Sequence, residues 1–576
     1  MQMFQVWAPA ARKVQLLLGR RKQPMKAVAG GWWRLAVRDA EPGSEYGFIL
    51  DGQGPFPDPR SPCQPGGVHR LSRLLDHSAF RWSDAGYQAP PLRSAVIYEL
   101  HVGTFTPQGT FIAAIDKLEH LVELGVTHVE LMPVAAFDGA WGWGYDGVSL
   151  FAPHGPYGEP ADLKRFVAAC HARGLAVLLD VVYNHLGPSG NYLGRFGPYF
   201  TTRYATPWGA ALNFDAGDHD EVRRFFCDNA LMWLRDYHFD GLRLDAIHAI
   251  LDLAAVPFLE QLADEVRQLG DRLGRRLVLI AESDLNAPRV VLPSARGGYG
   301  LDAQWADDFH HALHAVLTGE KQGYYADFGQ LAHLAKALER GFVYDGIYSK
   351  HRRCRIGRPP LGLAGDRFVV CLQNHDQVGN RARGERTAEL LSASRLKVGA
   401  ALVLASPFVP LLFAGEEWGA RTPFLYFADH RDPALAAAVR EGRRREYGVC
   451  GWKLDEIRAP GSLESFRDSK LDWAEPLRSP HAELLDWHRQ LIQLRRAEAD
   501  LAPSPMEEVK VRFDEPARWL ALERGSICLV CSLNSRRQTV PLPCGSYRPL
   551  LLSASAVQVG HGTVSLPPDT VAILKR

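Results

Sequence analysis

Eight short apolar runs, separated by segments with helical spacing, constrain the fold of this chain more than any other feature. The runs lie at 96–102, 128–134, 175–185, 241–246, 277–283, 301–309, 368–376 and 409–417. Between two of them Leu259, Leu262, Val266 and Leu269 recur at intervals of three and four, the spacing of one helix face. Eight buried strands alternating with helices are what a parallel (β/α)8 barrel requires. The sequence therefore predicts an α/β fold centred on a TIM barrel.

The two ends of the chain follow a different pattern from the centre. Residues 1–90 contain short strand-like runs such as FQVWAP and EYGFIL, separated by turns rich in Gly, Pro and Asp. Short strand-like runs return after 501, as in WLALERG and SICLVCSL. We expect three domains: an N-terminal β-sandwich at 1–90, the barrel at 91–500, and an all-β C-terminal sandwich at 501–576.

Charge and cysteine usage exclude several classes of function. The 66 Lys and Arg residues nearly balance the 65 Asp and Glu residues, which predicts no binding to nucleic acid or to an acidic membrane. The first residues lack the apolar core of a signal peptide, and no run approaches a membrane-spanning length. Cys528 and Cys531 form a CxxC within a strand-like run, where positions three apart face oppositely, so they suit neither a metal nor a disulfide. We expect a cytoplasmic protein that needs no cofactor and no metal.

Polar residues gather where most of the predicted strands end. They are Asp180, Asn184 and His185; Arg243 and Asp245; Glu282; Asp307 and Asp308; His375 and Asp376; and Glu416 and Glu417. In barrel enzymes the active site lies at the C-terminal ends of the strands. Alternate residues of a strand share a face, so Arg243 and Asp245 point together, away from Leu242 and Leu244. This pattern predicts an active site at the mouth of the barrel.

The residue types at the mouth indicate which chemistry is possible there. The chain has no Ser or Cys beside a His in a nucleophile motif and no glycine loop of the phosphate-binding type. Several carboxylates converge instead, and glycoside cleavage needs two carboxylates that flank the scissile bond. The segment WGWGYDG (141–147) and the aromatic residues Tyr183, Tyr192, Tyr199 and Trp208 could stack on sugar rings. These features favour an enzyme that cleaves sugars.

Four segments resemble the ordered motifs of the α-amylase family of glycoside hydrolases and transglycosidases. They are LLDVVYNH (178–185), GLRLDA (241–246), IAES (280–283) and LQNHD (372–376). The resemblance implies that Asp245 is the nucleophile, Glu282 the general acid/base and Asp376 a stabiliser of the transition state.

The same resemblance implies substrate contacts around these carboxylates. Arg243 would orient Asp245 and pair with Asp180, while His185 and His375 would hydrogen-bond the sugar that is cleaved. Tyr145 would stack beneath that sugar. We also expect substrate contacts from His248 and Gln377.

Within the family the resemblance is narrower and covers nearly the whole chain. IYELHVGTF (97–105), WGWGYDGV (141–148), WADDFHHALH (305–314) and NHDQVGNRARGER (374–386) are similar to members that hydrolyse maltooligosyl trehalose. This implies cleavage of the α-1,4 bond next to the terminal trehalose, release of trehalose, and a maltooligosyltrehalose synthase as functional partner. The N-terminal segment resembles the carbohydrate-binding-like module of branching and debranching relatives, for which sugar binding and simple packing both remain open.

The cluster WADDFHHALH has three interpretations. His310 and His314 are four apart, so a helix would place them together as metal ligands, with Asp307 or Asp308 adding oxygen. Alternatively, the aspartates end the sixth strand and the histidines pack the following helix. We favour a third interpretation, in which Asp307, Asp308, His310 and His311 hold substrate beyond the cleaved bond.

Two other functions use the same sequence features. An α-glucan branching enzyme or another transglycosidase would use the same three carboxylates, with a sugar hydroxyl in place of water. A catalytically inactive binding protein would be expected to lack one of them, and all three are present. Glu416 and Glu417, at the end of the eighth strand, suit a rim or structural role better than catalysis.

Overall fold

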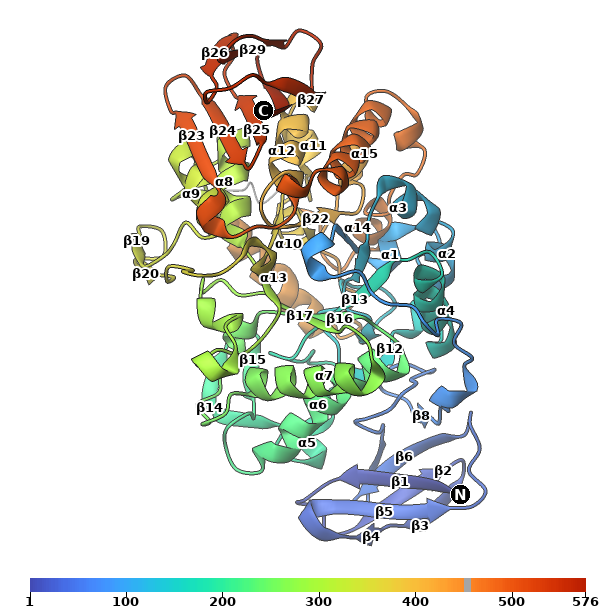
Figure 1. Ribbon diagram of the computed structural model, residues 1–576. Coiled ribbons are helices and arrows are strands. Elements are labelled where there is room, and N and C mark those ends of the chain that lie inside the picture. Colours follow the sequence, from blue (N-terminus) through green and yellow to red (C-terminus); the bar gives the residue numbers. More distant parts are fainter. Residues whose placement is uncertain (450–456) are drawn as a thin grey trace.

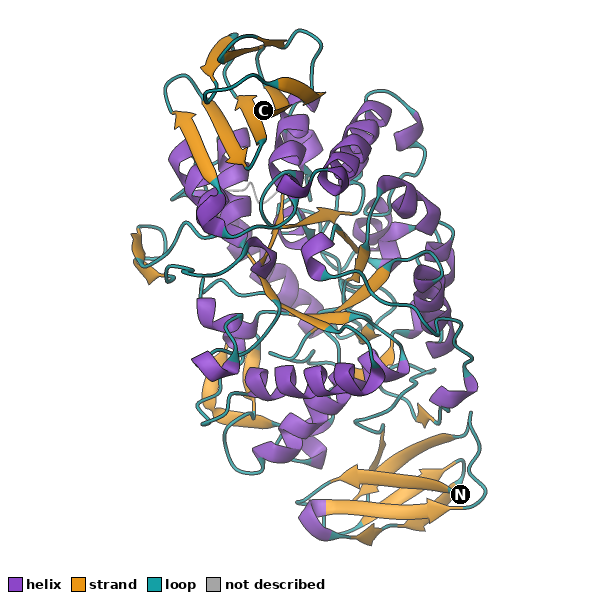
Figure 2. Cartoon of the chain, in the orientation of Figure 1, coloured by secondary structure: helices purple, strands orange, loops and turns teal. Residues whose placement is uncertain are grey.

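The computed structural model describes residues 1–449 and 457–576. Two groups of β-strands lie at opposite ends of a central body, one formed by the N-terminal residues and one by the C-terminal residues (Figure 1). The central body is a ring of strands surrounded by helices (Figure 2). The architecture is therefore a barrel flanked by two sheet domains, as the sequence predicts.

Eight parallel strands close the central barrel. In chain order they are β9 (Ile97–Leu100), β10 (His128–Leu131), β13 (Ala176–Val181), β16 (Gly241–Leu244), β17 (Val278–Ala281), β18 (Ala303–Trp305), β21 (Phe368–Cys371) and β22 (Val409–Phe413). Each of the eight predicted runs contains one of them, and β22 pairs with β9 to close the ring. The predicted (β/α)8 fold is confirmed.

Helices cover the outside of the ring. They include α3 (Leu118–Leu124), α4 (Pro160–His171), α6 (His219–Asp236), α7 (Phe258–Leu273), α8 (Asp307–Thr318), α9 (Leu331–Arg340), α12 (Ala393–Leu404) and α15 (His481–Ala497). In α7 the apolar face predicted by spacing, including Leu262 and Val266, is buried. That helix ends at Gly274 in the left-handed conformation (φ 62°), which glycine adopts without steric cost.

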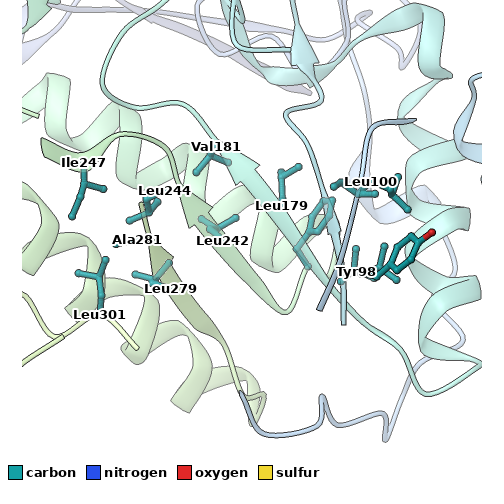
Figure 3. Close-up of a cluster of buried hydrophobic side chains, with 14 of the residues drawn as sticks. Tyr98, Leu100, Leu179, Val181, Leu242, Leu244, Ile247, Leu279, Ala281 and Leu301 are labelled. Carbon is teal, nitrogen blue, oxygen red and sulfur yellow. The ribbon is translucent and has the colours of Figure 1, made fainter. Parts of the chain in front are cut away.

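Side chains alternate between the two sides of the barrel wall. Leu242 and Leu244 belong to the apolar layer between strands and helices, together with Leu179 and Leu279 of the neighbouring strands (Figure 3). Arg243 therefore points into the barrel, on the same side as Asp245. The alternation carries Asp245 to the mouth, which explains why a charged pair occurs in a buried strand.

Two of the predicted strand ends are the beginnings of helices. Asp307 and Asp308 lie in the first turn of α8, and His375 and Asp376 begin α10 (His375–Gly379). The prediction that Asp307 and Asp308 end a strand is wrong. Carboxylates favour the first turn of a helix because unpaired N–H groups and the positive end of the helix dipole lie there.

The N-terminal domain consists of two small antiparallel sheets. One contains β1 (Gln2–Trp7), β5 (Trp32–Val37) and β4 (Lys26–Ala27), and the other β3 (Arg21–Pro24), β2 (Val14–Leu18), β6 (Glu45–Leu50) and β7 (Gln53–Phe56). The domain contacts α6, where Trp32 Nε1 donates to Glu221 Oε1 at 3.0 Å. Arg60 pairs with Asp228 of the same helix at 2.6 Å.

The C-terminal domain is a sandwich of a five-stranded and a three-stranded sheet. The larger sheet is built from β23 (Lys510–Asp514), β24 (Trp519–Arg524), β25 (Ile527–Ser532), β30 (Thr570–Lys575) and β27 (Arg548–Leu552). Cys528 belongs to the core between the two sheets, whereas Cys531 belongs to the core shared with the barrel. Both are free and face oppositely, as their spacing predicts.

Candidate active site

A cleft of about 540 Å³ opens at the C-terminal ends of the barrel strands. It is lined by Trp143, Tyr145, Asp146, His185, Trp208, Asp245, Ala246, His248, Glu282, Asp284, Tyr324, Asp376, Asn380, Tyr426 and Arg443. The structure thus brings together the three carboxylates expected to act in catalysis, and it adds aromatic rings on several sides.

Arg243 connects the carboxylates at the floor of the cleft. This fully buried residue of β16 donates from Nη1 to Asp180 Oδ2 and to Asp245 Oδ1, both at 2.8 Å. Its Nη2 lies 3.0 Å from Glu282 Oε2. The guanidinium also lies over the Trp305 ring, 4.3 Å from the ring centroid. One rigid, permanently charged group therefore fixes both carboxylates that the chemistry needs.

A sharp backbone turn after β16 positions these two carboxylates. Ala246 adopts the left-handed conformation (φ 39°, ψ 52°), which is strained for a residue with a side chain. In that conformation its N–H donates to Glu282 Oε2 at 2.7 Å. The other oxygen of Asp245, Oδ2, accepts a hydrogen bond from Asn184 Nδ2 at 2.7 Å. The strain at Ala246 therefore serves to orient Glu282.

The surroundings push the pKa values of the two carboxyl groups in opposite directions. Burial alone would raise the pKa of Asp245, but Arg243, His185 and the bond from Asn184 outweigh it and hold the pKa below its usual range. Burial raises the pKa of Glu282 well above its usual range; Arg243 opposes this rise, while the negative charges of Asp245 and Asp376 add to it. A low-pKa carboxylate beside a high-pKa carboxylic acid is the combination expected of a nucleophile and a general acid.

A chain of hydrogen bonds runs beneath the cleft from Glu99 to Arg243. Glu99 Oε1 lies 2.5 Å from His375 Nδ1, and His375 Nε2 lies 2.7 Å from the hydroxyl of Tyr145. That hydroxyl donates to Asp180 Oδ2 at 2.7 Å. Burial would lower the pKa of His375, but Glu99 and Asp376 raise it to about 9. His375 is thus held as a cation beside the Tyr145 ring, which it also stacks upon (centroids 5.3 Å apart).

One wall of the cleft lies next to Asp376. Asn380 Nδ2 donates to Asp376 Oδ1 at 3.3 Å, and Arg443 Nη1 donates to Asn380 Oδ1 at 2.5 Å. The Arg443 guanidinium lies over the Tyr426 ring, 3.8 Å from its centroid. Arg443 belongs to α13 (Pro433–Val449), so a helix after the last barrel strand reaches the third carboxylate.

Another wall lies next to Glu282 and contains His248. Asp284, two residues after Glu282, lies 3.6 Å from His248 Nδ1 and 2.8 Å from Arg352 Nη1. The half-exposed ring of Trp208 stacks on His185, with centroids 5.1 Å apart and planes at 11°. These groups provide both an aromatic face and hydrogen-bonding groups to a sugar chain in the cleft.

Four expected substrate-binding residues of α8 occupy other positions. Asp307 is partly buried and does not line the cleft, although burial and the charges of Asp376 and Asp308 raise its pKa to about 7. Asp308 is buried, and its Oδ2 accepts hydrogen bonds from Asn286 Nδ2 at 2.8 Å, Val343 N at 2.7 Å and Tyr344 N at 2.6 Å. The structure therefore gives Asp308 a role in joining loops, not in contacting sugar.

The histidines of α8 also have partners within the protein. His310 is buried and hydrogen-bonds the Tyr325 hydroxyl at 3.1 Å, while His314 donates to Glu320 Oε2 at 2.7 Å. His311 packs against Tyr324, which lines the cleft (centroids 4.9 Å apart). Direct substrate contact by His310 and His311 is not supported by this burial. Within residues 1–449 and 457–576, no group of three or more His, Cys, Asp or Glu side chains is placed to hold a metal ion.

Gln377, Glu416 and Glu417 are buried near the cleft and do not line it. Gln377 is buried next to Asp376 and does not line the cleft; its Oε1 has no hydrogen-bond partner. Glu416 and Glu417 are buried behind β22, where Glu417 Oε1 accepts hydrogen bonds from Tyr98 at 3.0 Å and His120 at 2.8 Å. That placement agrees with a structural role for Glu417.

Several residues of the site are absent from the set predicted from the sequence. Glu99 lies inside IYELHVGTF and Asn380 lies inside NHDQVGNRARGER, so a closer comparison of those segments could have identified them. Asn184 was predicted at a strand end, but without its bond to Asp245. Arg443 and Tyr426 lie in no such segment. Only the three-dimensional arrangement brings them to the cleft.

Among the described residues, no helix combines the length and the apolar composition that crossing a bilayer requires.

Comparison with protein families places both the barrel and the N-terminal domain. Residues 79–197 match the model of the alpha amylase catalytic domain. Residues 2–63 match carbohydrate-binding module 48, the isoamylase N-terminal domain. A crystal structure of an amylase-type protein from Salmonella typhimurium has 39% sequence identity and a TM-score of 0.92, covering 100% of this chain and 97% of that chain.

Comparison with individual relatives narrows the family further. The malto-oligosyltrehalose trehalohydrolase of Arthrobacter ramosus is 49% identical, over 99% of each chain. The 1,4-alpha-glucan branching enzyme GlgB of Burkholderia thailandensis is 31% identical, over 76% of this chain and 56% of its own. The chain therefore belongs to the malto-oligosyltrehalose trehalohydrolase family, within the α-amylase family of glycoside hydrolases.

Proposed function

We propose that this protein hydrolyses the α-1,4-glucosidic bond next to the terminal trehalose of malto-oligosyl trehalose, releasing trehalose and a maltooligosaccharide. The observation that carries this proposal is the pair Asp245 and Glu282, fixed by one guanidinium and shifted in opposite directions in pKa. The names of the full-length relatives supply the substrate.

The reaction begins with Glu282 protonated and Asp245 ionised. Glu282 gives its proton to the oxygen of the scissile bond while Asp245 attacks the anomeric carbon from the opposite face, forming a covalent glycosyl-enzyme. Trehalose leaves with the proton. Glu282, now ionised, takes a proton from a water molecule that attacks the same carbon and releases Asp245. Two inversions give net retention, and we expect the two carboxyl groups to be ~5–5.5 Å apart, the separation of retaining enzymes.

The neighbouring residues have complementary roles in this proposal. Arg243 keeps Asp245 ionised, and Asp376 stabilises positive charge that develops at the anomeric carbon. The Tyr145 ring stacks beneath the sugar, held by its hydrogen bonds to His375 and Asp180. His185 lines the cleft and donates a hydrogen bond to a sugar hydroxyl. Both ring nitrogens of the buried His375 are bonded to Glu99 and Tyr145, so His375 acts on the sugar only through the Tyr145 ring, and the direct contact expected from the sequence is not supported.

The leaving trehalose occupies the side of the cleft that contains the proton donor. His248 and Asp284 line the cleft there, next to Glu282. A site whose buried polar groups pair with an α,α-1,1-linked disaccharide leaves them unpaired when maltose binds, and such mismatches cost ~10⁴–10⁵ in specificity in favourable cases. The α-1,1 bond survives because trehalose lies entirely beyond the cleaved bond.

The decisive experiment is incubation of the purified protein with maltotriosyl trehalose, followed by product identification and NMR of the first reducing end. We expect trehalose and α-maltotriose, and an Asp245→Ala variant should be inactive by orders of magnitude while remaining folded. A β-anomeric first product would contradict the retaining mechanism. New 1,6-linkages would identify a branching enzyme instead.

The cellular setting completes the proposal. The substrate is made by a partner enzyme, a malto-oligosyltrehalose synthase, that converts the reducing end of a maltooligosaccharide into trehalose. We place the reaction in the reducing cytoplasm, which the free cysteines of the described residues support, among them Cys63, Cys170, Cys227 and Cys371.

A further inference from the structure

A second large cavity opens at the end of the barrel opposite the active site. It has a volume of about 620 Å³. Val96, Thr127 and Leu175 line it, and each lies just before a barrel strand (β9, β10 and β13). The C-terminal end of α15, which lies beside α3, and the residues after it form its other side (Figure 1). None of these residues takes part in the proposed hydrolysis.

Arginines dominate the charge around this cavity. Arg93, Arg173 and Arg496 line it and are exposed, and the buried Arg495 lines it as well. Arg173 has a weak partner, with Nε 3.7 Å from Glu119 Oε2. Within the part of the chain that the structure describes, neither Arg93 nor Arg496 has a carboxylate within 4.0 Å of its side-chain nitrogens. Among the described residues, Arg93 and Arg496 are therefore cations of the cavity wall without a carboxylate partner.

Two buried arginines add to this surplus of positive charge. Arg495 donates to the carbonyl oxygens of Leu404 (2.7 Å), Ser406 (3.0 Å) and Phe408 (2.5 Å). Arg524 donates to the same Ser406 oxygen at 2.8 Å. Their side chains are only 6% and 3% exposed.

Among the described residues, the two guanidinium groups are bound by neutral backbone carbonyl groups alone. In the described residues no carboxylate lies within ion-pair distance of either, and Arg524 Nε has no hydrogen-bond partner. Burial, together with the nearby Arg524, lowers the pKa of Arg495 to about 9. Buried cations without a counter-ion are costly, and proteins normally pair them.

Two carboxylates that follow α15, Glu498 and Asp500, already have partners of their own. Glu498, which lines the cavity, accepts a hydrogen bond from Lys575 Nζ at 2.7 Å. Asp500 accepts hydrogen bonds from the backbone and hydroxyl of Ser526, at 2.8 and 2.6 Å. Glu498 and Asp500 therefore do not neutralise Arg93 and Arg496, and no other carboxylate of the described residues pairs with these two arginines.

We propose that this cavity is a binding site for an oxyanion of the phosphate class, either free phosphate or the phosphoryl group of a small metabolite. Planar guanidinium groups match the oxygens of such an anion in bidentate hydrogen bonds, and a cavity of this size holds a phosphorylated monosaccharide. Arg93 and Arg496 contact the anion directly. Arg495, whose guanidinium donates to backbone carbonyls, and Arg524 add positive charge without contacting the anion.

The position of the site predicts what binding does. Arg524 belongs to the C-terminal sandwich, and its carbonyl partner Ser406 belongs to the barrel. An anion here offsets the repulsion between cations at the junction of the two domains. Because it binds the native state alone, it should raise the unfolding temperature, while kcat/KM at the other end of the barrel stays unchanged.

The test is calorimetric titration and thermal unfolding of the full-length protein, prepared without phosphate, against inorganic phosphate and against glucose 6-phosphate. Sodium chloride at equal ionic strength corrects for screening. We expect saturable binding of at least one of the two anions with a Kd below ~1 mM, and a raised unfolding temperature. Tighter binding of glucose 6-phosphate would identify a phosphorylated sugar as the ligand; tighter binding of phosphate would identify the free ion.

Variants separate a specific site from general charge effects. An Arg93→Gln/Arg496→Gln variant should bind at least tenfold more weakly while its kcat/KM is unchanged. The control is Arg20→Gln/Arg21→Gln, which removes the same charge from an exposed hairpin of the N-terminal domain and should bind normally. Absence of saturable binding to the wild type, or equal weakening in both variants, would overturn the proposal.

Discussion

Arg243 contacts two carboxyl groups that must carry different charges when the substrate arrives. A full ion pair with both would hold both ionised and leave no proton for the leaving group. The geometry avoids this outcome because Asp245 gains a further hydrogen bond from Asn184, while Glu282 is surrounded by the negative charges of Asp245, Asp376 and Asp307. The active protonation state is therefore set by the unequal surroundings of the two groups.

The pH dependence of activity should reveal this inequality. The proposed reaction requires ionised Asp245 and protonated Glu282. The kcat/KM should therefore fall at low pH, where Asp245 with its lowered pKa becomes protonated, and at high pH, where Glu282 with its raised pKa loses its proton. Asp307 raises the pKa of Glu282, so Asp307→Asn should lower that pKa and move the alkaline limb to lower pH. The control Asp366→Asn, which removes a carboxylate that does not act on Glu282, should leave the limb in place. An unmoved limb in Asp307→Asn would mean that another group sets it.

Glu99 and His375 should link stability to pH. The folded-state pKa of His375, about 9, lies above the unfolded value of ~6.5, so the pair contributes its full stability below about pH 6.5 and loses it as the pH rises through 9. Glu99→Gln removes the partner. The difference in unfolding temperature between wild type and variant should be large at pH 6 and much smaller near pH 9.5. A difference independent of pH would show that His375 is neutral in the folded protein.

At the scale of elements, loops and helix ends divide into those that face the substrate and those that hold the scaffold. Asp308 begins α8 and ties it to the backbone at Val343 and Tyr344. Trp208 lies between β14 (Phe200–Thr206) and β15 (Gly209–Leu212), with 48% of its surface exposed in the cleft. Asp308 therefore stabilises the scaffold, whereas Trp208 lines the cleft and faces the substrate.

Substitution of these two residues should separate stability from binding. Asp308→Ala leaves buried N–H groups without an acceptor, at a cost of ~1–3 kcal/mol for each group, so it should lower the unfolding temperature without raising KM. Trp208→Ala removes a ring that can stack on sugar and should raise KM with little change in unfolding temperature. Measuring both quantities for both variants checks the assignment. A raised KM in Asp308→Ala at unchanged stability would restore the substrate role that the sequence suggested.

These elements also explain what could be predicted from sequence. The barrel strands were predictable because a strand covered on both faces is a continuous apolar run, as in β13. That Asp245, Glu282 and Asp376 share one cleft was predictable because each follows such a run within a recognisable motif. The bonds of Asp308 to the adjacent loops could not be predicted because spacing does not tell whether a carboxylate at a helix start faces the cleft or the loops. Arg443 could not be predicted because α13 reaches the site only through the tertiary fold.

In the whole molecule, polar residues of both flanking domains bind the barrel. In the N-terminal domain Trp32 and Arg60, which could have contacted glycan, bind Glu221 and Asp228 of α6. In the C-terminal domain Arg524 binds carbonyl groups of the barrel. The active-site cleft and the arginine-lined cavity then lie at opposite ends of the barrel strands, so substrate and anion would bind independently.

In the proposed reaction the cleft selects trehalose on the leaving-group side of Glu282. The most direct measurement compares kcat/KM for maltotriosyl trehalose with kcat/KM for maltopentaose, two substrates with the same number of glucose units. We predict a preference of at least ~100-fold for maltotriosyl trehalose, about 3 kcal/mol of transition-state binding, with trehalose as the released disaccharide. Equal values for the two substrates would contradict the account and leave a general α-glucan hydrolase.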